Sequence, residues 1–352
     1  MSEYPSIDLL ASRLEGLPAQ LALALRTSLP GRPPQWAKLA AMRRFVVTGG
    51  GLSEGPARVL VARLQRAGRE ARFEPQSAFL VERDCGAGSA VILFSQGLAP
   101  NARLPLPAMI SSEAALLVTS VVADHAMSKH VRSLVAAGHL VWTLPPERED
   151  GLLLRVVGPA IALLAALRIA EALTGASASR PNVFASLPDL AQRVLAAPGP
   201  DLFGGARRPI AIVTEPSLLE LAMPLRWKLL EGLRVPDPPV WDPLQVAHGP
   251  LQSFYEHPLT ILMLRTASGE HDESFARLEQ VLRADRHHVV ELRASPASAS
   301  MDIPLALLEL DAALNAALLA TLQAHPIALD DWPARGLDGP LYDVTAVRCD
   351  DR

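Results

Sequence analysis

A lysine and a glutamate lie three residues apart in the second half of the chain, at Lys228 and Glu231. Residues at this spacing share one face of a helix, so the ammonium and the carboxylate can meet at one small ligand. A carboxylate can move a proton while a neighbouring cation holds negative charge that develops on oxygen. The same pair on an exposed helix is a solvated ion pair that contributes only about 0.3–0.5 kcal/mol. The spacing alone leaves both interpretations open.

A histidine follows this pair, in the sequence His248-Gly249-Pro250. Histidine titrates close to neutral pH, which suits it to acid and base chemistry. A histidine before Gly-Pro is more often a turn residue than a catalytic one. His248 becomes a candidate catalytic residue only together with Lys228 and Glu231, which precede it in the sequence.

A second candidate site lies in the first half of the chain, where Gly49, Gly50 and Gly51 follow an apolar run and precede a helical one. Glycines at such a turn let backbone N–H groups approach an anion, and the helix N-terminus adds free donors and a favourable dipole. A glycine run is a weak signal by itself, and a tight turn without a ligand explains it about as well.

The elements that would position these residues alternate along the chain, with short apolar runs typical of strands followed by longer runs typical of helices. The expected strands are Arg44–Thr48, Ala71–Glu74, Ala90–Ser95, Ala115–Ser120, Leu140–Leu144, Pro209–Thr214, a weak one near Val240, Leu259–Leu264 and His288–Leu292. Alternating β and α elements predict parallel sheets covered by helices on both faces. The expected fold class is therefore α/β, with two doubly wound parallel-sheet domains.

The expected organisation has five parts. They are an N-terminal helical arm (1–42), a first domain (43–175), a linker (176–204), a second domain (205–324) and a C-terminal segment (325–352). The linker is rich in Ala, Pro, Ser and Gly, which favours a connection between domains.

Composition excludes several classes of protein. The 352 residues are 49% hydrophobic and carry a net charge of −4, which gives no electrostatic reason to expect nucleic acid or an anionic membrane as a partner. The two cysteines, Cys85 and Cys349, have no metal-ligand spacing, so we expect no metal, no disulfide and a reducing cytoplasm. The most apolar stretch, 156–167, is too short to span a bilayer and predicts a buried helix.

Three segments together resemble the double sugar-isomerase (SIS) domain family, in particular the isomerase domain of glucosamine-6-phosphate synthase. The run from Thr214 to Glu231 follows that family's Lys-x-x-Glu helix, and His248 begins its His-Gly-Pro turn. Ser53 matches the last hydroxyl of the family's Gly-x-Gly-Thr-Ser loop. Ser95 and Gln96 match the start of its Ser-Gln-Ser-Gly-Glu-Thr loop.

The resemblance implies two flavodoxin-like SIS domains related by pseudo-twofold symmetry, preceded by a helical arm. It also implies a homodimer without a cofactor that binds a sugar or a sugar phosphate. Glu231 would be the base of an aldose–ketose isomerisation or a deamination, Lys228 would hold the enediolate oxygen, and His248 would open the sugar ring in the partner chain's site. The substrate would contact a group of residues in the first domain: Gly51, Ser53, Ser95, Gln96 and Asn101.

Several positions depart from the family pattern. Leu52, Gly97 and Pro100 stand where the family has phosphate-binding hydroxyls, and Asn101 can supply one amide donor in partial compensation. Asp343 falls where the synthase has its C-terminal lysine, in a segment from Leu341 that is a candidate active-site lid. Three functions stay open: an isomerase or deaminase of an amino sugar or similar polyol, a lyase that reuses the same base, and a catalytically silent sugar-binding regulator.

Overall fold

The computed structural model describes residues 4–31, 33–81, 85–122, 126–145, 149–175, 183–296, 298, 303–333, 336–337 and 339–342. The chain forms two compact units, each built around one parallel sheet. The five-stranded unit comprises Leu23–Glu149, Ile161–Pro181 and Asp331–Arg352. The four-stranded unit comprises Met1–Ala22, Asp150–Ala160 and Asn182–Asp330. The chain therefore passes between the units several times, first within the N-terminal helix.

The sheet of the five-stranded unit has the order β2-β1-β3-β4-β5, and all its strands are parallel. The strands are β1 (Arg44–Gly49), β2 (Glu70–Phe73), β3 (Ser89–Phe94), β4 (Ala114–Thr119) and β5 (Leu140–Thr143). Every residue of β3 and β4 is buried, as expected for central strands with helices on both faces. The chain order reverses direction across the sheet between β1 and β3, which makes this pair the topological switch point.

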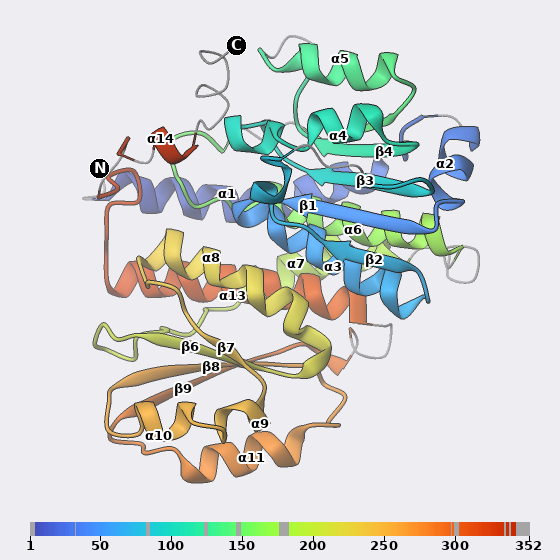
Figure 1. Ribbon diagram of the computed structural model, residues 1–352. Helices are drawn as coiled ribbons and strands as arrows, with labels where there is room; N and C mark the ends of the chain where they lie inside the picture. Colours follow the sequence, from blue (N-terminus) through green and yellow to red (C-terminus); the bar gives the residue numbers. More distant parts are fainter. Residues whose placement is uncertain are drawn as a thin grey trace. The chain divides into compact units, whose positions relative to one another are not determined.

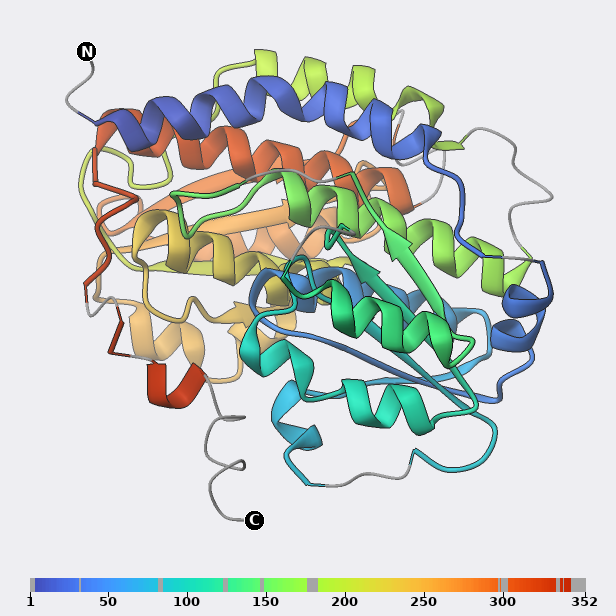
Figure 2. The same cartoon turned by 90° about the horizontal axis from the view of Figure 1, so that it is seen from above.

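Helices cover both faces of this sheet (Figure 1). Those carried by the unit are α2 (Pro33–Ala40), η1 (Gly51–Ser53), α3 (Glu54–Arg66), η2 (Gln76–Phe79), η3 (Pro100–Arg103), α4 (Leu106–Ser111), α5 (Ser128–Ala136) and most of α6 (Val157–Thr174). Figure 1 shows α4 and α5 on one face and α3 and α6 on the other. In the view from above, the teal and green helices α4 and α5 stand in front of the strands (Figure 2).

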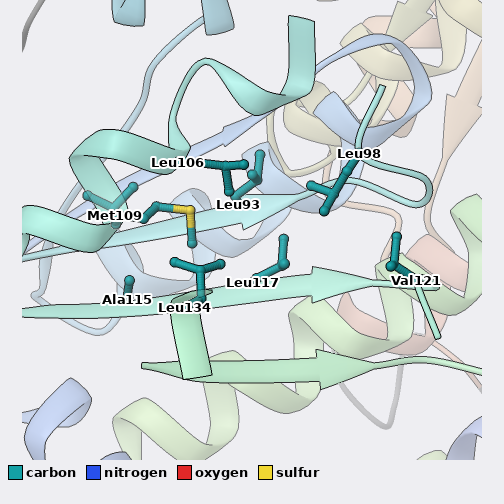
Figure 3. Packing of buried hydrophobic residues seen from close by; sticks show 9 residues of the cluster. Leu93, Leu98, Leu106, Met109, Ala115, Leu117, Val121 and Leu134 are labelled. Carbon is teal, nitrogen blue, oxygen red and sulfur yellow. The ribbon is translucent and has the colours of Figure 1, made fainter. Parts of the chain in front are cut away.

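The core under α4 and α5 is a cluster of aliphatic side chains (Figure 3). Leu93 of β3 and Leu117 of β4 pack there against Met109 of α4 and Leu134 of α5. Leu98, from the loop after β3, joins the cluster near the carboxyl ends of the strands (Figure 3). This apolar face anchors the loop that carries part of the candidate site.

The sheet of the four-stranded unit has the order β7-β6-β8-β9 and is also parallel. Its strands are β6 (Ile210–Thr214), β7 (Val240–Trp241), β8 (Leu259–Arg265) and β9 (His287–Arg293). Its helices are α1 (Pro5–Arg26, as far as Ala22), η5 (Val183–Ser186), α7 (Leu187–Ala196), η6 (Pro216–Leu218), α8 (Leu219–Leu233), α9 (Pro243–Val246), α10 (Pro250–Phe254), α11 (Asp272–Val281) and α13 (Ile303–Ala324). Figure 1 shows α9, α10 and α11 on one face of the sheet and α8 and α13 on the other. A short helix, α14 (Gly339–Tyr342), follows in the chain and belongs to the five-stranded unit.

The predicted fold class is confirmed, because all nine expected strands form and they make two separate parallel sheets. The two sheets have the same strand order, with β6, β7, β8 and β9 standing for β1, β2, β3 and β4. The pseudo-twofold relation between the domains stays a prediction, as do the predicted boundaries at residues 42, 175, 204 and 324.

Two helices, α6 and α13, are long and apolar enough to cross a membrane by length and composition. In α13, however, 83% of the apolar window is buried within the protein, and in α6 61% is buried. The fold uses both as core helices, which is the role that sequence analysis predicted for the run at 156–167.

Candidate functional site

The loop after β1 turns sharply into α3, and two of its glycines are required for geometric reasons. A Cβ added at Gly49 would lie 2.3 Å from the carbonyl oxygen of Ser53, so no larger residue fits. Gly51 has a φ of 55°, in the left-handed region that favours glycine. Gly51 and the half-buried Ser53 form the one-turn helix η1, and Ser53 N–H donates to the Gly50 carbonyl at 3.1 Å.

The loop after β3 is held in a tight turn by Ser95. The buried Ser95 Oγ accepts a hydrogen bond from the Leu98 N–H at 3.1 Å. Leu98 has a φ of 50°, which a branched side chain adopts only at a cost, and it is 1% exposed within the aliphatic cluster. Burial of the Leu98 side chain offsets that strain and fixes the loop.

Gln96 is anchored through its backbone by the end of β4. Its carbonyl accepts hydrogen bonds from Thr119 Oγ1 at 3.1 Å and from Ser120 N–H at 2.9 Å. Asn101 lies farther along the same loop, half-buried in η3. The structure therefore brings Ser95, Gln96 and Asn101 into one ordered loop.

The two loops start side by side, because Gly49 of β1 pairs in register with Phe94 of β3. They leave the sheet at its switch point, where open parallel sheets bind their ligands. A Cβ at Gly50 would meet the Gln76 side-chain oxygen at 2.6 Å, so the start of η2 also borders the glycine loop. Gly51, Ser53, Ser95, Gln96 and Asn101 thus lie in two neighbouring loops of one unit.

A buried carboxylate stands at the beginning of α3, and sequence analysis did not single it out. Glu54 is 8% exposed and is the first residue of the helix. Its Oε1 accepts a hydrogen bond from Arg58 Nε at 2.6 Å, and the Arg58 guanidinium lies over the Phe73 ring at 4.3 Å. The sequence signal was present, because an acidic residue follows the glycine run after only two residues, Leu52 and Ser53.

The second group of predicted residues lies in the four-stranded unit. Lys228 and Glu231 are both on α8, one turn apart. Lys228 is only 2% exposed, and its Nζ donates to Asp311 Oδ1 at 2.5 Å and to Asn315 Oδ1 at 2.9 Å. Lys228 is therefore a buried ammonium held by α13, with two of its three donors in hydrogen bonds. The solvated surface pair considered from spacing is excluded for this lysine.

Glu231 is half-buried on the same helix, whereas His248 is exposed. His248 lies in the turn between α9 and α10, followed by Gly249 with a φ of 117°. The Gly-Pro pair thus makes the turn that sequence analysis predicted.

Asp311 and Asn315 are the partners of Lys228 that sequence analysis missed. They are 5% and 0% exposed, four residues apart on a helix that is otherwise rich in Leu and Ala. Two polar residues on one face of an apolar helix are the signal that could have identified them. The sequence could not reveal that they meet a lysine 83 and 87 residues earlier.

At the switch point of the other sheet, between β6 and β8, a buried carboxylate is bonded to the residue after the neighbouring strand β8. Glu215 is 3% exposed, and it accepts hydrogen bonds from Thr266 N–H at 2.7 Å and from Thr266 Oγ1 at 2.8 Å. The polar groups of Glu215 and Thr266 are therefore already bonded to each other at this point. The five-stranded sheet is the better candidate for a ligand.

Within the described ranges, no group of three His, Cys, Asp or Glu side chains could hold a metal ion. Asp343 and the rest of the candidate lid beyond Tyr342 lie outside the described residues.

No protein-family model matches the chain, and no curated protein is significantly similar to it in sequence. Solved structures are similar to it in fold. Tagatose-6-phosphate ketose/aldose isomerase from Escherichia coli has a TM-score of 0.70 and 14% identity, covering 91% of this chain and 94% of its own. Glucosamine-6-phosphate deaminase from Thermotoga maritima has a TM-score of 0.64 and 15% identity, covering 92% and 97%.

The C-terminal domain of glucosamine-fructose-6-phosphate aminotransferase from Francisella tularensis is a third similar structure. Its TM-score is 0.61 at 14% identity, covering 87% of this chain and 96% of its own. The predicted resemblance is confirmed at the level of the fold: the chain folds like these three proteins, with two parallel α/β sheets. At such identities the likeness establishes the fold alone.

Proposed function

We propose that the protein is a sugar-isomerase-like enzyme that acts on an amino sugar, its phosphate or a similar polyol by carboxylate-mediated proton transfer. The observation that supports the proposal is the pair of loops at the β1/β3 switch point, which carry Ser53, Ser95 and Gln96. These loops occur in a chain whose fold is similar, over 91% of its length, to a ketose/aldose isomerase.

In this proposal Glu231 is the base that moves a proton between C1 and C2 of the open-chain sugar. Glu231 is half-buried on α8, and a carboxylate is a side chain that can accept a proton from a carbon acid. Lys228 supplies positive charge one turn away on α8. Its ion pair with Asp311 suits Lys228 to the role of a cation in this proposal.

Substrate binding is assigned to Gly51, Ser53, Ser95, Gln96 and Asn101. Ser95 Oγ accepts from Leu98 N–H and so keeps its own O–H free to donate to a ligand. The proposal includes a homodimer in the cytoplasm, in which the exposed His248 serves the partner chain's site and opens the sugar ring. No cofactor, nucleic acid or membrane takes part in this scheme.

A catalytically silent sugar-binding regulator is the second candidate, and one observation favours it. Leu52, Gly97 and Pro100 remove three hydroxyls from the loops that match the family's phosphate site. A hydrogen bond to a charged group contributes about 1.5–3 kcal/mol, so such a loss could leave a protein that binds weakly and does not turn substrate over. A lyase that reuses Glu231 is the third reading of the same residues.

The test is an activity screen of the purified full chain. Aldose and ketose forms of hexoses, hexosamines and their 6-phosphates are incubated with the protein, and products are followed by NMR. The enzyme proposal predicts interconversion of at least one pair or release of ammonia from a hexosamine. Binding of a sugar without turnover of any would favour the regulator, and no binding at all would contradict both candidates.

A further inference from the structure

The beginning of α3 is poorly equipped to bind a phosphate, although it follows a glycine loop at the switch point. A helix N-terminus attracts anions through the free N–H groups of its first turn. Here the Ser53 N–H donates to the Gly50 carbonyl, and the Glu54 N–H donates to the Gly51 carbonyl. Pro56, the third residue of the helix, has no N–H. Three of the expected donors are therefore used internally or missing.

The positive end of α3 is also already neutralised. Side chains in a helix lean toward its N-terminus, so the Glu54 carboxylate lies at the first turn, and Arg58 reaches back one turn to contact it. A carboxylate at this end takes up the favourable interaction with the helix dipole that an incoming phosphate would use. The nearest cation on α3, Arg58, is bound to that carboxylate and packed over Phe73.

The loop after β3 does not replace these donors. The Leu98 N–H is bonded to Ser95 Oγ, and Pro100 has no N–H. Arg103, at the end of the same loop, lies near His130 of α5. The pKa of His130 is lowered by burial first, then by the positive charge of Lys129, and then by that of Arg103. The hydroxyl and amide groups of Ser53, Ser95 and Asn101 are neutral, which suits the hydroxyls of a sugar.

We propose that this site takes a sugar without a phosphate group, and that Glu54 determines this specificity by repelling the phosphate. The inference rests on the proposed function, since it assigns a substrate class to the same two loops. It adds a residue, Glu54, and it chooses between the phosphorylated and unphosphorylated substrates that the proposed function leaves open.

The experiment measures binding of matched ligand pairs to the full chain by calorimetry. The pairs are glucosamine with glucosamine 6-phosphate and fructose with fructose 6-phosphate. The wild-type protein should bind the unphosphorylated member of at least one pair about tenfold more tightly, a difference of about 1.4 kcal/mol. Glu54→Gln keeps the acceptor for Arg58 but removes the negative charge, and it should narrow that ratio about tenfold by strengthening phosphate binding.

Glu70→Gln is the matched control, because Glu70 is exposed at the start of β2 and the substitution is the same. The control should leave the ratio unchanged. Tighter binding of a 6-phosphate by the wild-type protein would overturn the inference and leave the proposed function intact. An unchanged ratio in Glu54→Gln would overturn the role of Glu54, and binding of no sugar in either pair would overturn the proposed function itself.

Discussion

At the scale of single residues, the buried group of Lys228, Asp311 and Asn315 is the least expected feature. Asp311 Oδ2 and Asn315 Nδ2 are buried and have no hydrogen-bond partner among the described residues. Burying an ion pair is costly, and its net contribution to stability is small or negative compared with apolar residues of the same volume. A pair kept at such a cost is consistent with a functional role for Lys228 beside Glu231.

Removing one partner of this pair should be far more damaging than removing the whole group. Asp311→Asn leaves the Lys228 ammonium buried without a counter-ion, so we expect a loss of about 3–5 kcal/mol in the free energy of unfolding. The triple variant Lys228→Met, Asp311→Leu, Asn315→Leu should be about as stable as the wild-type protein or more stable. Urea unfolding measures both.

Asp237→Asn is the control for that comparison. Asp237 pairs with Arg226 at 3.5 Å, but its side chain is 85% exposed, so the same substitution should cost at most about 1 kcal/mol. An Asp311→Asn variant as stable as this control would show that the buried pair does not form. A triple variant that is stable but inactive would assign the charges to function.

Leu98 makes a second residue-scale prediction, because its backbone and its side chain have opposite requirements. Truncating this buried side chain should cost about 2–5 kcal/mol. At a φ of 50°, however, glycine avoids a strain of about 1–2 kcal/mol that alanine keeps. We therefore expect Leu98→Gly to be more stable than Leu98→Ala in urea unfolding, the reverse of the usual order. Leu93, in β3 of the same cluster, should show the usual order, with alanine more stable than glycine.

At the scale of elements, the strands were predictable because buried parallel strands appear in a sequence as short apolar runs. The weakest of them, near Val240, is only two residues long, Val240–Trp241. The glycine loop was predictable because an apolar strand, a glycine run and a helix follow one another in sequence. The pairing of α8 with α13 through Lys228 was not, since it joins residues far apart in the chain and leaves no local pattern.

The same limit applies to two buried carboxylates, those of Glu54 and Glu215. Glu54 and Glu215 each follow directly after the end of a strand or its loop, and nothing local tells whether such a residue faces solvent or turns inward. Their burial depends on Arg58 in one case and on Thr266 in the other. Thr266 lies 51 residues away in sequence, so only the folded chain reveals the second contact.

An element-scale prediction concerns Asp201, which ties the segment after α7 to the end of α13. Its carboxylate accepts hydrogen bonds from the N–H groups of Phe203 and Gly205, and it lies 3.1 Å from His325 Nε2. Burial by itself would raise the pKa of Asp201, but these hydrogen bonds and the neighbouring histidine outweigh burial and lower it.

The sign of the effect on stability follows from that lowered pKa. Between the folded and the unfolded pKa, the latter near 3.8, the unfolded state binds more protons, so the free energy of unfolding rises with pH. The stabilisation is complete above the unfolded pKa and disappears as the pH falls through the folded one. Urea unfolding from about pH 6 to about pH 2.5 should show the wild-type advantage over Asp201→Asn vanishing at the acid end. A constant difference across that range would contradict the prediction.

At the scale of the whole molecule, the chain contains two units with the same strand order but different switch points. In the five-stranded unit, the loops at the switch point carry glycines and neutral polar groups. In the four-stranded unit, Glu215 accepts hydrogen bonds from Thr266 at the switch point. The two sheets therefore share a strand order but differ in the described residues at their switch points, and the proposal assigns sugar binding to the five-stranded unit. The four-stranded unit contributes Lys228, Glu231 and His248 to the proposal.

The proposed role of the exposed His248 in a partner chain requires a dimer. Closed twofold dimers are the commonest assemblies of such proteins. Light scattering at micromolar concentration should give a mass twice the 37.7 kDa of one chain. In mixtures of His248→Ala and Glu231→Gln chains, activity should partly recover, because one of the two sites in a mixed dimer is intact. A monomer would rule out a shared site.

The most direct test of the central claim is the exchange of solvent deuterium into the sugar. A carboxylate that carries a proton between C1 and C2 should wash deuterium from D₂O into those positions, which NMR detects even when net conversion is small. For a substrate found in the activity screen, the account predicts that Glu231→Gln slows this exchange by about 10²–10⁴-fold while sugar binding persists. Exchange at the wild-type rate in Glu231→Gln would contradict the account.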